Sequence, residues 1–418
     1  MFLSRLLRPL IRLGRLTVID ADGTVHQFGD DMARPVTVRL HARSLHWKLA
    51  LNPGLHAGEA WMDGTLTIED ASLHAFLDLL GRNLAATGQS DIKGPLDGLR
   101  HLFRRAQQFN PAARACRNVA HHYNLSAELF ELFLDADRQY SCAYFPTGDH
   151  DLEAAQLRKK QHIAAKLLLE PGLRVLEIGC GWGGLGLYLA EKLGVEVTGI
   201  TLSEEQLKVA KARATAAGLE RRAQFLLRDY RHQQGTYDRV VSIAMFEAVG
   251  LNHYGAFFRT IRDRLSDDGV ALLHTIGRQS GPGSTNPWLQ KYIFPGGYSP
   301  ALSELTAAIE RAGLWITDVE TLRLHYAYTL QHWLDRFQTN RARVASLYDE
   351  RFCRMWEYYL VGSEISFRYW DLMNFQIQFT RHQHALPITR DYMFEAEKAL
   401  RIKDRRIEER ESLKIAGE

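Results

Sequence analysis

A glycine-rich turn between an apolar strand and a helix is the first place where this chain invites chemistry. Residues 174–186 read RVLEIGCGWGGLG, so a short β-branched and apolar run stops at closely spaced glycines, and an apolar helical pattern begins at Leu185. Strand, tight turn and helix bring backbone N–H groups close to a nucleotide-like ligand, and glycine permits both the turn and the close approach. The pattern predicts either plain strand–helix packing or a ligand site built on Gly179, Gly181 and Gly183.

Hydroxyl and amide side chains follow the next strand-like run. That run ends at Thr201, about 20 residues after the glycine turn, where a ribose-binding carboxylate is expected but absent. The segment TLSEEQ (201–206) instead offers Thr201, Ser203 and Gln206 to ligand hydroxyls. Ser203 is equally suited to cap the following helix, with Gln206 completing a capping box, and the two roles are compatible.

Further candidate groups come at the ends of later strands or just before the sheet. Asp229 and Tyr230 suit either an adenine contact or a simple loop cap, at the sheet edge where ligands bind in α/β folds. Glu247 follows an apolar run and is expected either at the ligand cleft or on the surface at a helix start. Taken alone, His274 is more typical of a structural histidine, and Cys142 of a small buried hydrophobic residue.

Composition excludes several classes of function. The 418 residues are 46% hydrophobic and 24% charged, which is ordinary for a globular protein with one large and one smaller core. A net charge of +3 does not indicate nucleic-acid binding. The four cysteines are scattered without a C-x-x-C pair, so neither a metal site nor a disulfide framework is indicated, and a reducing cytoplasm fits best. No run approaches the roughly 20 apolar residues that span a bilayer.

The N-terminal stretch MFLSRLLRPLIRLGRL is basic and amphipathic. Arginines recur at helical spacing (Arg5, Arg8, Arg12 and Arg15), and leucines occupy much of the remaining surface. Amphipathicity alone favours two interpretations equally: an interfacial helix at the membrane surface, or a terminal helix packed on its own domain.

Two regions are expected along the chain, 1–98 and 99–418. The first has strand-like runs at 16–19, 36–40 and 66–68, a helix at 72–80 and a linker at 81–98, which together predict a small α+β domain. Helical sequence follows from 99 to 137. From 173 onward, strands alternate with helices such as 203–217 and 254–265, with strands expected at 174–179, 195–201, 223–228, 238–243, 269–276 and 316–323. This alternation predicts a parallel sheet covered on both faces, with an aromatic-rich helical insertion at 324–372 and a late strand at 375–380 completing an edge.

Taken together, seven motifs resemble the cyclopropane-fatty-acyl-phospholipid synthase family, including the mycolic acid cyclopropane synthases. The motifs run in order from about His121 to Arg381: QYSCAYF, VLEIGCGWGG, GITLSEEQ, MFEAVG, LLHTIG, NPWLQKYIFPGG and HYAYTLQHW. The resemblance implies a class I S-adenosylmethionine methyltransferase fold, Rossmann-like, with a mostly parallel seven-stranded sheet, the helical insertion and a small N-terminal α+β domain. It also implies a cytoplasmic enzyme bound peripherally to the inner membrane face. A homodimer is a further expectation.

The resemblance implies a reaction and a set of site residues. S-adenosylmethionine supplies a methylene to the cis double bond of an unsaturated phospholipid acyl chain, and bound bicarbonate removes the proton. The implied bicarbonate site comprises Cys142 through its backbone, Glu247, His274, Ile276 through its N–H, and Tyr326. The implied S-adenosylmethionine contacts are Tyr140, Ser141, Glu177, Gly179, Gly181, Gly183, Thr201, Gln206, Asp229 and Tyr230. No metal and no nucleic acid are implied.

Two positions depart from the family pattern, and two other functions compete. Ser363 stands where family members often carry cysteine, so a role for that thiol does not transfer, and Ala248 stands where many have histidine. A lipid C-methyltransferase that leaves a methyl branch would share nearly all of these residues. A non-catalytic lipid- or cofactor-binding protein is a third interpretation, but Glu247, His274 and Tyr326 are all retained.

Overall fold

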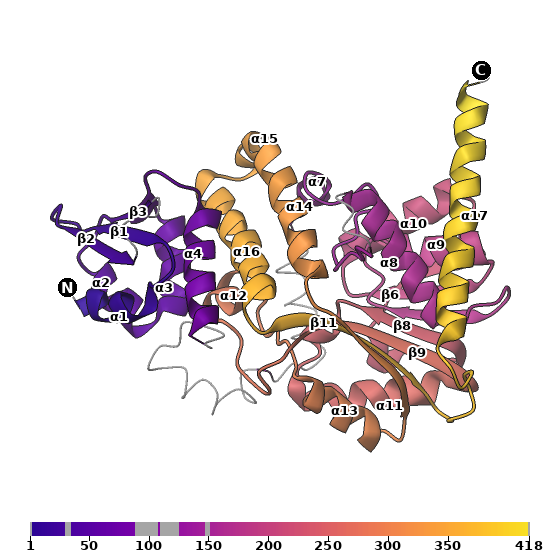
Figure 1. Ribbon diagram of the computed structural model, residues 1–418. Helices are drawn as coiled ribbons and strands as arrows, with labels where there is room; N and C mark the ends of the chain where they lie inside the picture. The colour runs from indigo at the N-terminus through magenta and orange to yellow at the C-terminus, as the bar shows by residue number, and fades with distance from the viewer. Residues whose placement is uncertain (1, 30–34, 88–107, 109–124, 147–150, 417–418) are drawn as a thin grey trace.

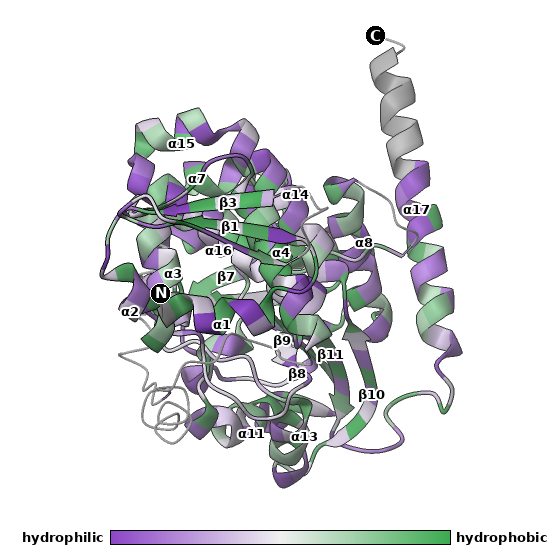
Figure 2. Cartoon of the chain, turned by 60° about the vertical axis from the view of Figure 1, so that its left-hand side comes forward, coloured by the Kyte–Doolittle hydropathy of each residue, from purple (hydrophilic) through white to green (hydrophobic). Residues whose placement is uncertain are grey.

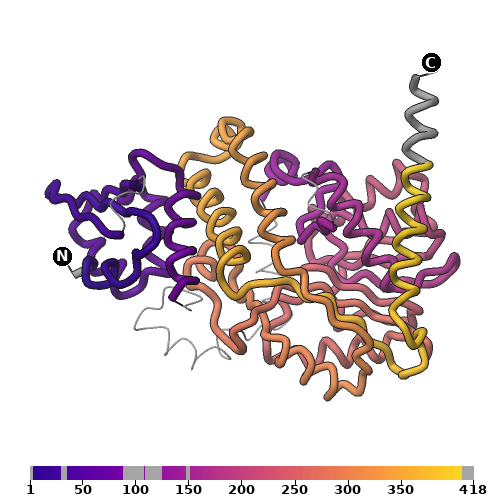
Figure 3. The backbone as a smooth tube through the Cα atoms, in the orientation of Figure 1, coloured from indigo at the N-terminus to yellow at the C-terminus, as the bar shows by residue number. Residues whose placement is uncertain are grey.

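The computed structural model describes residues 2–29, 35–87, 108, 125–146 and 151–416. Figure 1 shows a small sheet with its helices at the N-terminal end, a middle group of helices, and a larger sheet covered by helices. The chain begins at one end of this arrangement and finishes at the other, as the tube in Figure 3 shows.

The larger sheet has seven strands among the described residues, in the order β10-β11-β9-β8-β5-β6-β7. The strands β5 to β9 run parallel, and β11 is antiparallel to both of its neighbours. This confirms the mostly parallel sheet, but the late strand does not complete an edge: it lies inside the sheet, and β10 forms the edge. The strands are β5 (Arg174–Ile178), β6 (Glu196–Thr201), β7 (Ala223–Leu227), β8 (Tyr237–Ile243), β9 (Leu265–Arg278), β10 (Trp315–Leu322) and β11 (Leu372–Thr380).

Consecutive residues of the central strands enter two different cores, because side chains alternate across a sheet. Val175 packs in the core with α8 (Leu152–Lys166), α9 (Gly184–Leu193) and α10 (Glu204–Ala216), whereas Leu176 packs on the other face with α11 (Tyr254–Arg264) and α13 (Leu302–Arg311). Burial on both faces explains why apolar residues stand next to each other in these strands, as in Val175-Leu176 and Val240-Val241, rather than in strict alternation.

The insertion predicted at 324–372 is helical. It comprises α14 (His325–Thr339), α15 (Arg341–Leu347) and α16 (Glu350–Tyr369), and a short helix, α12 (Pro287–Tyr292), precedes it. Its aromatic residues form a third core with the described part of the segment expected to be helical at 99–137, where α7 (Ala127–Glu131) lies. Most of that expected helical segment lies outside the described residues.

The N-terminal part is α+β, as expected, with sheet order β2-β1-β3-β4. One detail differs from expectation. The helix predicted at 72–80 continues to Ala86, so part of the predicted linker is helical, and the linker from residue 88 onward lies outside the described residues. The elements of the N-terminal part are α1 (Phe2–Leu10), β1 (Arg15–Ile19), β2 (Val25–Gly29), β3 (Pro35–Leu40), α2 (Leu45–Leu51), α3 (Pro53–Met62), β4 (Leu66–Ile68) and α4 (Leu73–Ala86).

The first helix packs on its own domain through Leu3, Leu7 and Leu10. It ends at Leu10, so the helical arginine series stops there: Arg12 follows the helix and Arg15 begins β1. The backbone is fixed after the helix by Asn83, whose side-chain oxygen accepts from the N–H groups of Arg12 and Leu13 at 2.7 and 2.8 Å.

The N-terminal part docks on the helical insertion and on α12. The Glu59 carboxylate of α3 accepts from the Lys291 ammonium at 2.6 Å and from the Tyr292 hydroxyl at 3.0 Å. Trp288 packs against Gly58, where a Cβ would lie 2.5 Å from the indole nitrogen. The N-terminal part and the rest of the chain therefore pack closely against each other. The domain boundary at 98/99 stays a prediction.

Apolar residues gather on the strands, and polar residues gather on the outer faces of the helices (Figure 2). The last helix, α17 (Asp391–Ala416), is largely hydrophilic and is held by polar contacts. Its Glu397 accepts from His162 of α8 at 3.0 Å, and its Asp404 accepts from Tyr188 at 2.9 Å. No described helix is both long and apolar enough to cross a membrane.

Candidate active site

A cavity of about 300 Å³ lies at the carboxyl end of the parallel strands, where α/β folds bind ligands. Its polar half is formed by the ends of β5 and β6, by residues 138–141, and by Asp229 and Glu247. Its apolar half is formed by α12, α14, α16 and the segment around residues 294–299. A polar half next to an apolar half suits two ligands of different chemistry that meet inside one cavity.

Two of the three predicted loop glycines line this cavity. Gly179 has φ +86° and Gly181 φ +54°, a left-handed backbone that glycine adopts without strain. A Cβ on Gly179 would lie 2.7 Å from the Cβ of Met245, whereas a Cβ on Gly181 would meet nothing within 4 Å. Gly183 does not line the cavity: it caps α9, and its Cβ would meet Ala210 and Phe225 at 3.0 Å. Gly183 therefore serves packing.

Glu177 lies in the cavity wall beneath the start of α9. It is 3% exposed, and burial raises the pKa of its carboxyl to about 8 despite the nearby ammonium of Lys159. Its Oε2 has no hydrogen-bond partner among the described residues. A buried carboxyl oxygen without a partner is costly, and a cationic or N–H-bearing ligand would relieve that cost.

Thr201 and Gln206 both line the cavity, and Ser203 caps α10. The Ser203 hydroxyl accepts from the Gln206 N–H at 3.3 Å, which confirms the predicted cap. The reciprocal half of the capping box is absent, because the Gln206 side-chain oxygen instead accepts from the Thr201 hydroxyl at 3.0 Å. The two side chains thus orient each other at the cavity.

Asp229 caps the short helix η1 (Tyr230–His232), which confirms the loop-cap interpretation. Its carboxylate accepts from the Arg231 N–H at 2.9 Å and forms a two-point contact with the Arg231 guanidinium at 2.8 and 2.7 Å. Although burial opposes it, these hydrogen bonds lower the pKa of Asp229. Asp229 and Tyr230 also line the cavity, so an adenine contact stays a prediction.

Tyr140 and Ser141 line the cavity beside a residue that the sequence did not single out, Lys159 of α8. Lys159 is 1% exposed and donates to the Ser141 hydroxyl at 2.8 Å and to the side-chain oxygen of Gln139. Burial lowers the pKa of its ammonium to about 8. A lysine in a helix is normally solvated, so the sequence carried no signal for this position.

Glu247 is in the cavity and not on the surface, because the short helix η2 (Phe246–Ala248) turns it inward. Its Oε1 accepts from the backbone N–H of Ile276 at 2.5 Å, and Ile276 also lines the cavity. Its Oε2 is buried without a partner among the described residues. Burial raises the pKa of the Glu247 carboxyl. The hydrogen bond from the Ile276 N–H acts in the opposite direction but does not cancel this rise. The surface interpretation of Glu247 is therefore wrong.

His274 is completely buried next to the cavity but does not line it. Its two ring nitrogens lie 3.2 Å from the side-chain amides of Asn374 and Gln376 of β11. Burial lowers the pKa of His274 to about 3, so the ring is neutral at physiological pH. A neutral ring has one donor and one acceptor, so one amide must present its oxygen and the other its NH₂.

Cys142 also lies outside the cavity lining, whereas Tyr326 is part of it. The Cys142 thiol is fully buried and donates to the Ala143 carbonyl at 3.3 Å, and burial raises its pKa, which fits the small-hydrophobe interpretation of the side chain. Tyr326 lies 4.7 Å from Phe367 between ring centroids. Ser363 lines the cavity on the neighbouring helix α16. Within the described residues, no cluster of His, Cys, Asp and Glu could hold a metal.

A family model described as mycolic acid cyclopropane synthetase matches residues 111–377 of this chain. The cyclopropane-fatty-acyl-phospholipid synthase of Escherichia coli K12 is 36% identical over 347 residues, covering 83% of this chain and 88% of that protein. The tuberculostearic acid methyltransferase UfaA1 of Mycobacterium tuberculosis is 35% identical over 383 residues, covering 87% of each.

Solved structures of two cyclopropane synthases resemble about two thirds of this chain. The cyclopropane synthase MmaA2 from Mycobacterium tuberculosis aligns with a TM-score of 0.61 and 31% identity, covering 65% of this chain and 99% of that one. The mycolic acid cyclopropane synthase CmaA1, complexed with SAH and CTAB, aligns with a TM-score of 0.60 and 33% identity at the same coverage.

Proposed function

This chain belongs to the mycolic acid cyclopropane synthetase family of S-adenosylmethionine-dependent methyltransferases, and from that premise we propose that it cyclopropanates unsaturated phospholipid acyl chains. The observation that carries the proposal is a single cavity lined both by the glycine loop with its polar neighbours and by apolar side chains of the helical insertion, with the Glu247 carboxylate among them. The relatives of this chain include proteins named for mycolic acids and proteins named for phospholipids. The choice of a phospholipid substrate therefore rests on the similarity to the Escherichia coli enzyme over most of both chains.

The polar half of the cavity is the proposed place for S-adenosylmethionine. When bound, S-adenosylmethionine supplies an electrophilic methyl group on a sulfonium. Gly179 and Gly181 expose the loop backbone, Thr201 and Gln206 offer oxygens to ribose hydroxyls, and Glu177 offers its unpartnered oxygen to a cationic group. Tyr140 and Ser141 close the same half, with Lys159 holding the Ser141 hydroxyl.

The apolar half is the proposed place for the acyl chain. Its walls are formed by side chains of α12, α14 and α16, namely Leu289, Leu330, Tyr359, Ser363 and Phe367, and by Phe294 and Leu372. The alkene electron pair forms the new C–C bond to the methyl group, and the sulfur keeps the electrons of the bond that breaks. The resulting cation loses a proton from the transferred methyl, and that C–H electron pair closes the ring. Aromatic faces such as those of Tyr326 and Phe367 stabilise a nearby cation.

The proton needs an acceptor that does not itself trap the cation. The proposed acceptor is bicarbonate held beside Glu247, whose Oε2 is buried without a partner among the described residues, with Tyr326 in the same cavity. The Ile276 N–H already donates to Glu247, so Ile276 positions the carboxylate. His274, neutral and held by two amides, fixes the strand from which Ile276 projects.

A second candidate function is a lipid C-methyltransferase that leaves a methyl branch. The observation that favours it is the similarity to the tuberculostearic acid methyltransferase, which is nearly as high as that to the Escherichia coli synthase and covers slightly more of this chain.

Mass spectrometry of the product separates the two functions. We expect purified protein, given S-adenosylmethionine and vesicles of a monounsaturated phospholipid, to add one CH₂ to the acyl chain with loss of the olefin. Ozonolysis of the product lipid then gives no cleavage. A product that ozone cleaves, that keeps its double bond, or that is a saturated methyl-branched chain contradicts cyclopropanation and supports the second function. If no unsaturated lipid gives any product, both functions are contradicted.

The N-terminal domain is the proposed contact with the inner face of the cytoplasmic membrane. Its first two helices pack on each other and leave apolar side chains exposed: Leu6 48%, Trp47 59% and Leu51 51%. The cations Arg5, Arg8 and Arg12 are exposed in the same N-terminal segment as Leu6. Apolar side chains flanked by arginines match an interface of acyl chains and anionic headgroups.

Removing two of these arginines should weaken vesicle binding. Each basic residue at an anionic surface contributes about 1 kcal/mol, so Arg5→Gln with Arg8→Gln should lower the partition coefficient roughly thirtyfold. Sedimentation with vesicles containing phosphatidylglycerol measures it. The charge-matched control is Arg221→Gln with Arg222→Gln, two exposed positions between α10 and β7. Equal binding by both double variants would show that the N-terminal helix is only packed on its domain.

A further inference from the structure

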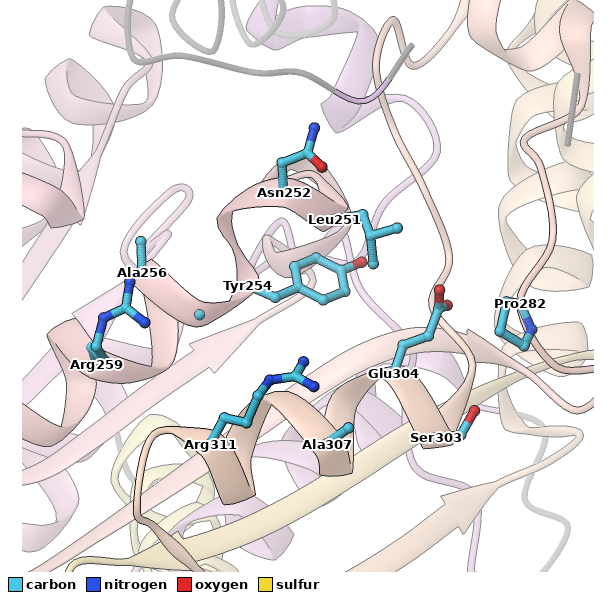
Figure 4. Close-up of a pocket in the computed structure, with 11 residues that line it drawn as sticks. Leu251, Asn252, Tyr254, Ala256, Arg259, Pro282, Ser303, Glu304, Ala307 and Arg311 are labelled. Carbon is cyan, nitrogen blue, oxygen red and sulfur yellow. The ribbon is translucent and has the colours of Figure 1, made fainter. Parts of the chain in front are cut away.

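A second hollow, separate from the reaction cavity, opens between α11 and α13. It has a volume of about 540 Å³ and is bordered by the short helix η3 (Leu251–His253) and by Pro282 (Figure 4). Both α11 and α13 follow strands whose carboxyl ends face the reaction cavity, so the N-terminal ends of the two helices lie at that edge of the sheet.

Two arginines line the groove from opposite helices. Arg259 comes from α11 and Arg311 from α13, and the guanidinium of Arg311 reaches toward the ring of Tyr254 in Figure 4. Both side chains are exposed, and neither has a hydrogen-bond or ion-pair partner among the described residues. Guanidinium groups present several N–H donors in a fixed plane, which suits oxyanions with more than one acceptor oxygen.

Tyr254 adds a buried donor to the same groove. Its side chain is 3% exposed, and its hydroxyl has no hydrogen-bond partner among the described residues. The hydroxyl points along the groove between Leu251 and Glu304 in Figure 4. Leaving a buried hydroxyl unpaired costs about 1–3 kcal/mol, which a ligand oxygen would remove. Burial raises the pKa of Tyr254, so the hydroxyl keeps its proton and can donate.

The groove also offers apolar surface, and a hydrogen bond joins one of its residues to a residue of the reaction cavity. Leu251, Ala256, Ala307 and Pro282 supply the apolar part. Tyr298, which lines the reaction cavity, donates to Glu304 of the groove at 2.7 Å. Glu304 lies at the end of the groove away from Arg259 (Figure 4), so the cationic end stays open to an anion.

We propose that this groove binds the phosphodiester of a phospholipid headgroup, with Arg259 and Arg311 as donors to the phosphoryl oxygens and the Tyr254 hydroxyl as a donor to another oxygen of the same lipid, nearer Glu304. The inference rests on the proposed function, since it names the headgroup contact of the same lipid substrate class. Two guanidiniums match a phosphoryl group, the hydroxyl matches an ester or glycerol oxygen, and the adjoining apolar surface matches the glycerol backbone and first acyl carbons.

The test is calorimetric titration of the full chain with dihexanoylphosphatidylglycerol below its micelle concentration, with inorganic phosphate, and with dihexanoylglycerol. Arg259→Gln with Arg311→Gln should weaken dihexanoylphosphatidylglycerol binding at least tenfold and leave dihexanoylglycerol binding unchanged. Tyr254→Phe, which keeps the ring, should weaken it about threefold. The matched control is Arg262→Gln, an exposed arginine of α11 outside the groove, which should stay within twofold.

Two outcomes overturn the assignment. If the double variant binds the phospholipid like the Arg262→Gln control, the groove does not hold the headgroup. If inorganic phosphate binds through both arginines as tightly as the phospholipid, the groove is a free-phosphate site. Turnover separates this proposal from the parent one: the double variant should raise KM for phospholipid vesicles without lowering kcat. A wild-type protein inactive on every lipid contradicts the proposed function, while the titration still reports on the groove.

Discussion

Replacing Glu247 by glutamine is expected to reduce lipid turnover by roughly 100- to 1,000-fold while leaving cofactor affinity nearly unchanged. Glutamine keeps the side-chain oxygen that accepts from the Ile276 N–H at 2.5 Å, so the strand end and the cavity wall stay in place. What is lost is the second carboxylate oxygen, which is buried and unpartnered among the described residues. If that oxygen orients the proton acceptor, the proton transfer that commits the cation to product fails.

The measurement has three parts. Product is quantified by mass spectrometry of the phospholipid. Affinity for S-adenosylhomocysteine (SAH), the cofactor without its methyl group, is measured by calorimetry, and folding by thermal denaturation. The matched control is Glu310→Gln, an exposed carboxylate on α13 outside both hollows, which should keep wild-type turnover. Wild-type turnover should also fall in bicarbonate-free buffer. A Glu247→Gln variant that turns over at the wild-type rate would refute the assignment, whereas one that loses SAH binding as well would assign Glu247 to the cofactor.

The parallel sheet was predictable because its strands are buried on both faces. Val175 and Leu176 enter different cores, so apolar residues stand next to each other in the sequence, and the carboxyl ends of β5, β6 and β8 lie at the same sheet edge. That shared edge explains why Gly179, Thr201, Asp229 and Glu247 line one cavity although they are far apart in sequence.

What could not be predicted depends on pairing between distant residues. The position of β11 inside the sheet, rather than at its edge, is decided by antiparallel pairing with β9 and β10, and no local pattern encodes it. Lys159 reads as a solvated helix residue until its partners Gln139 and Ser141 fold over it. The resemblance places His274 in one site with Glu247, yet the His274 ring pairs with Asn374 and Gln376 of that same late strand.

Gly181 gives the sharpest test of where the cofactor lies, because an added methyl group there meets only empty space in the protein itself. Its backbone has φ +54°, and a Cβ would find no protein atom within 4 Å although the residue lines the cavity. Gly181→Ala should therefore fold, with the destabilisation of about 1–2 kcal/mol that an alanine in this backbone region incurs. Its methyl group would occupy the space proposed for S-adenosylmethionine, so we expect SAH affinity to fall 10- to 100-fold.

The chain contains a matched control for the backbone strain. Gly218, just after α10, has φ +66°, and a Cβ there also meets nothing within 4 Å, but it lies outside the cavity. Gly218→Ala should lower the melting temperature by a similar amount and leave SAH affinity within twofold. Calorimetric titration and thermal denaturation of both variants measure the two effects separately. Equal SAH affinity in both variants would mean that the loop positions α9 without touching the ligand, because strain alone is then the whole effect of the methyl group.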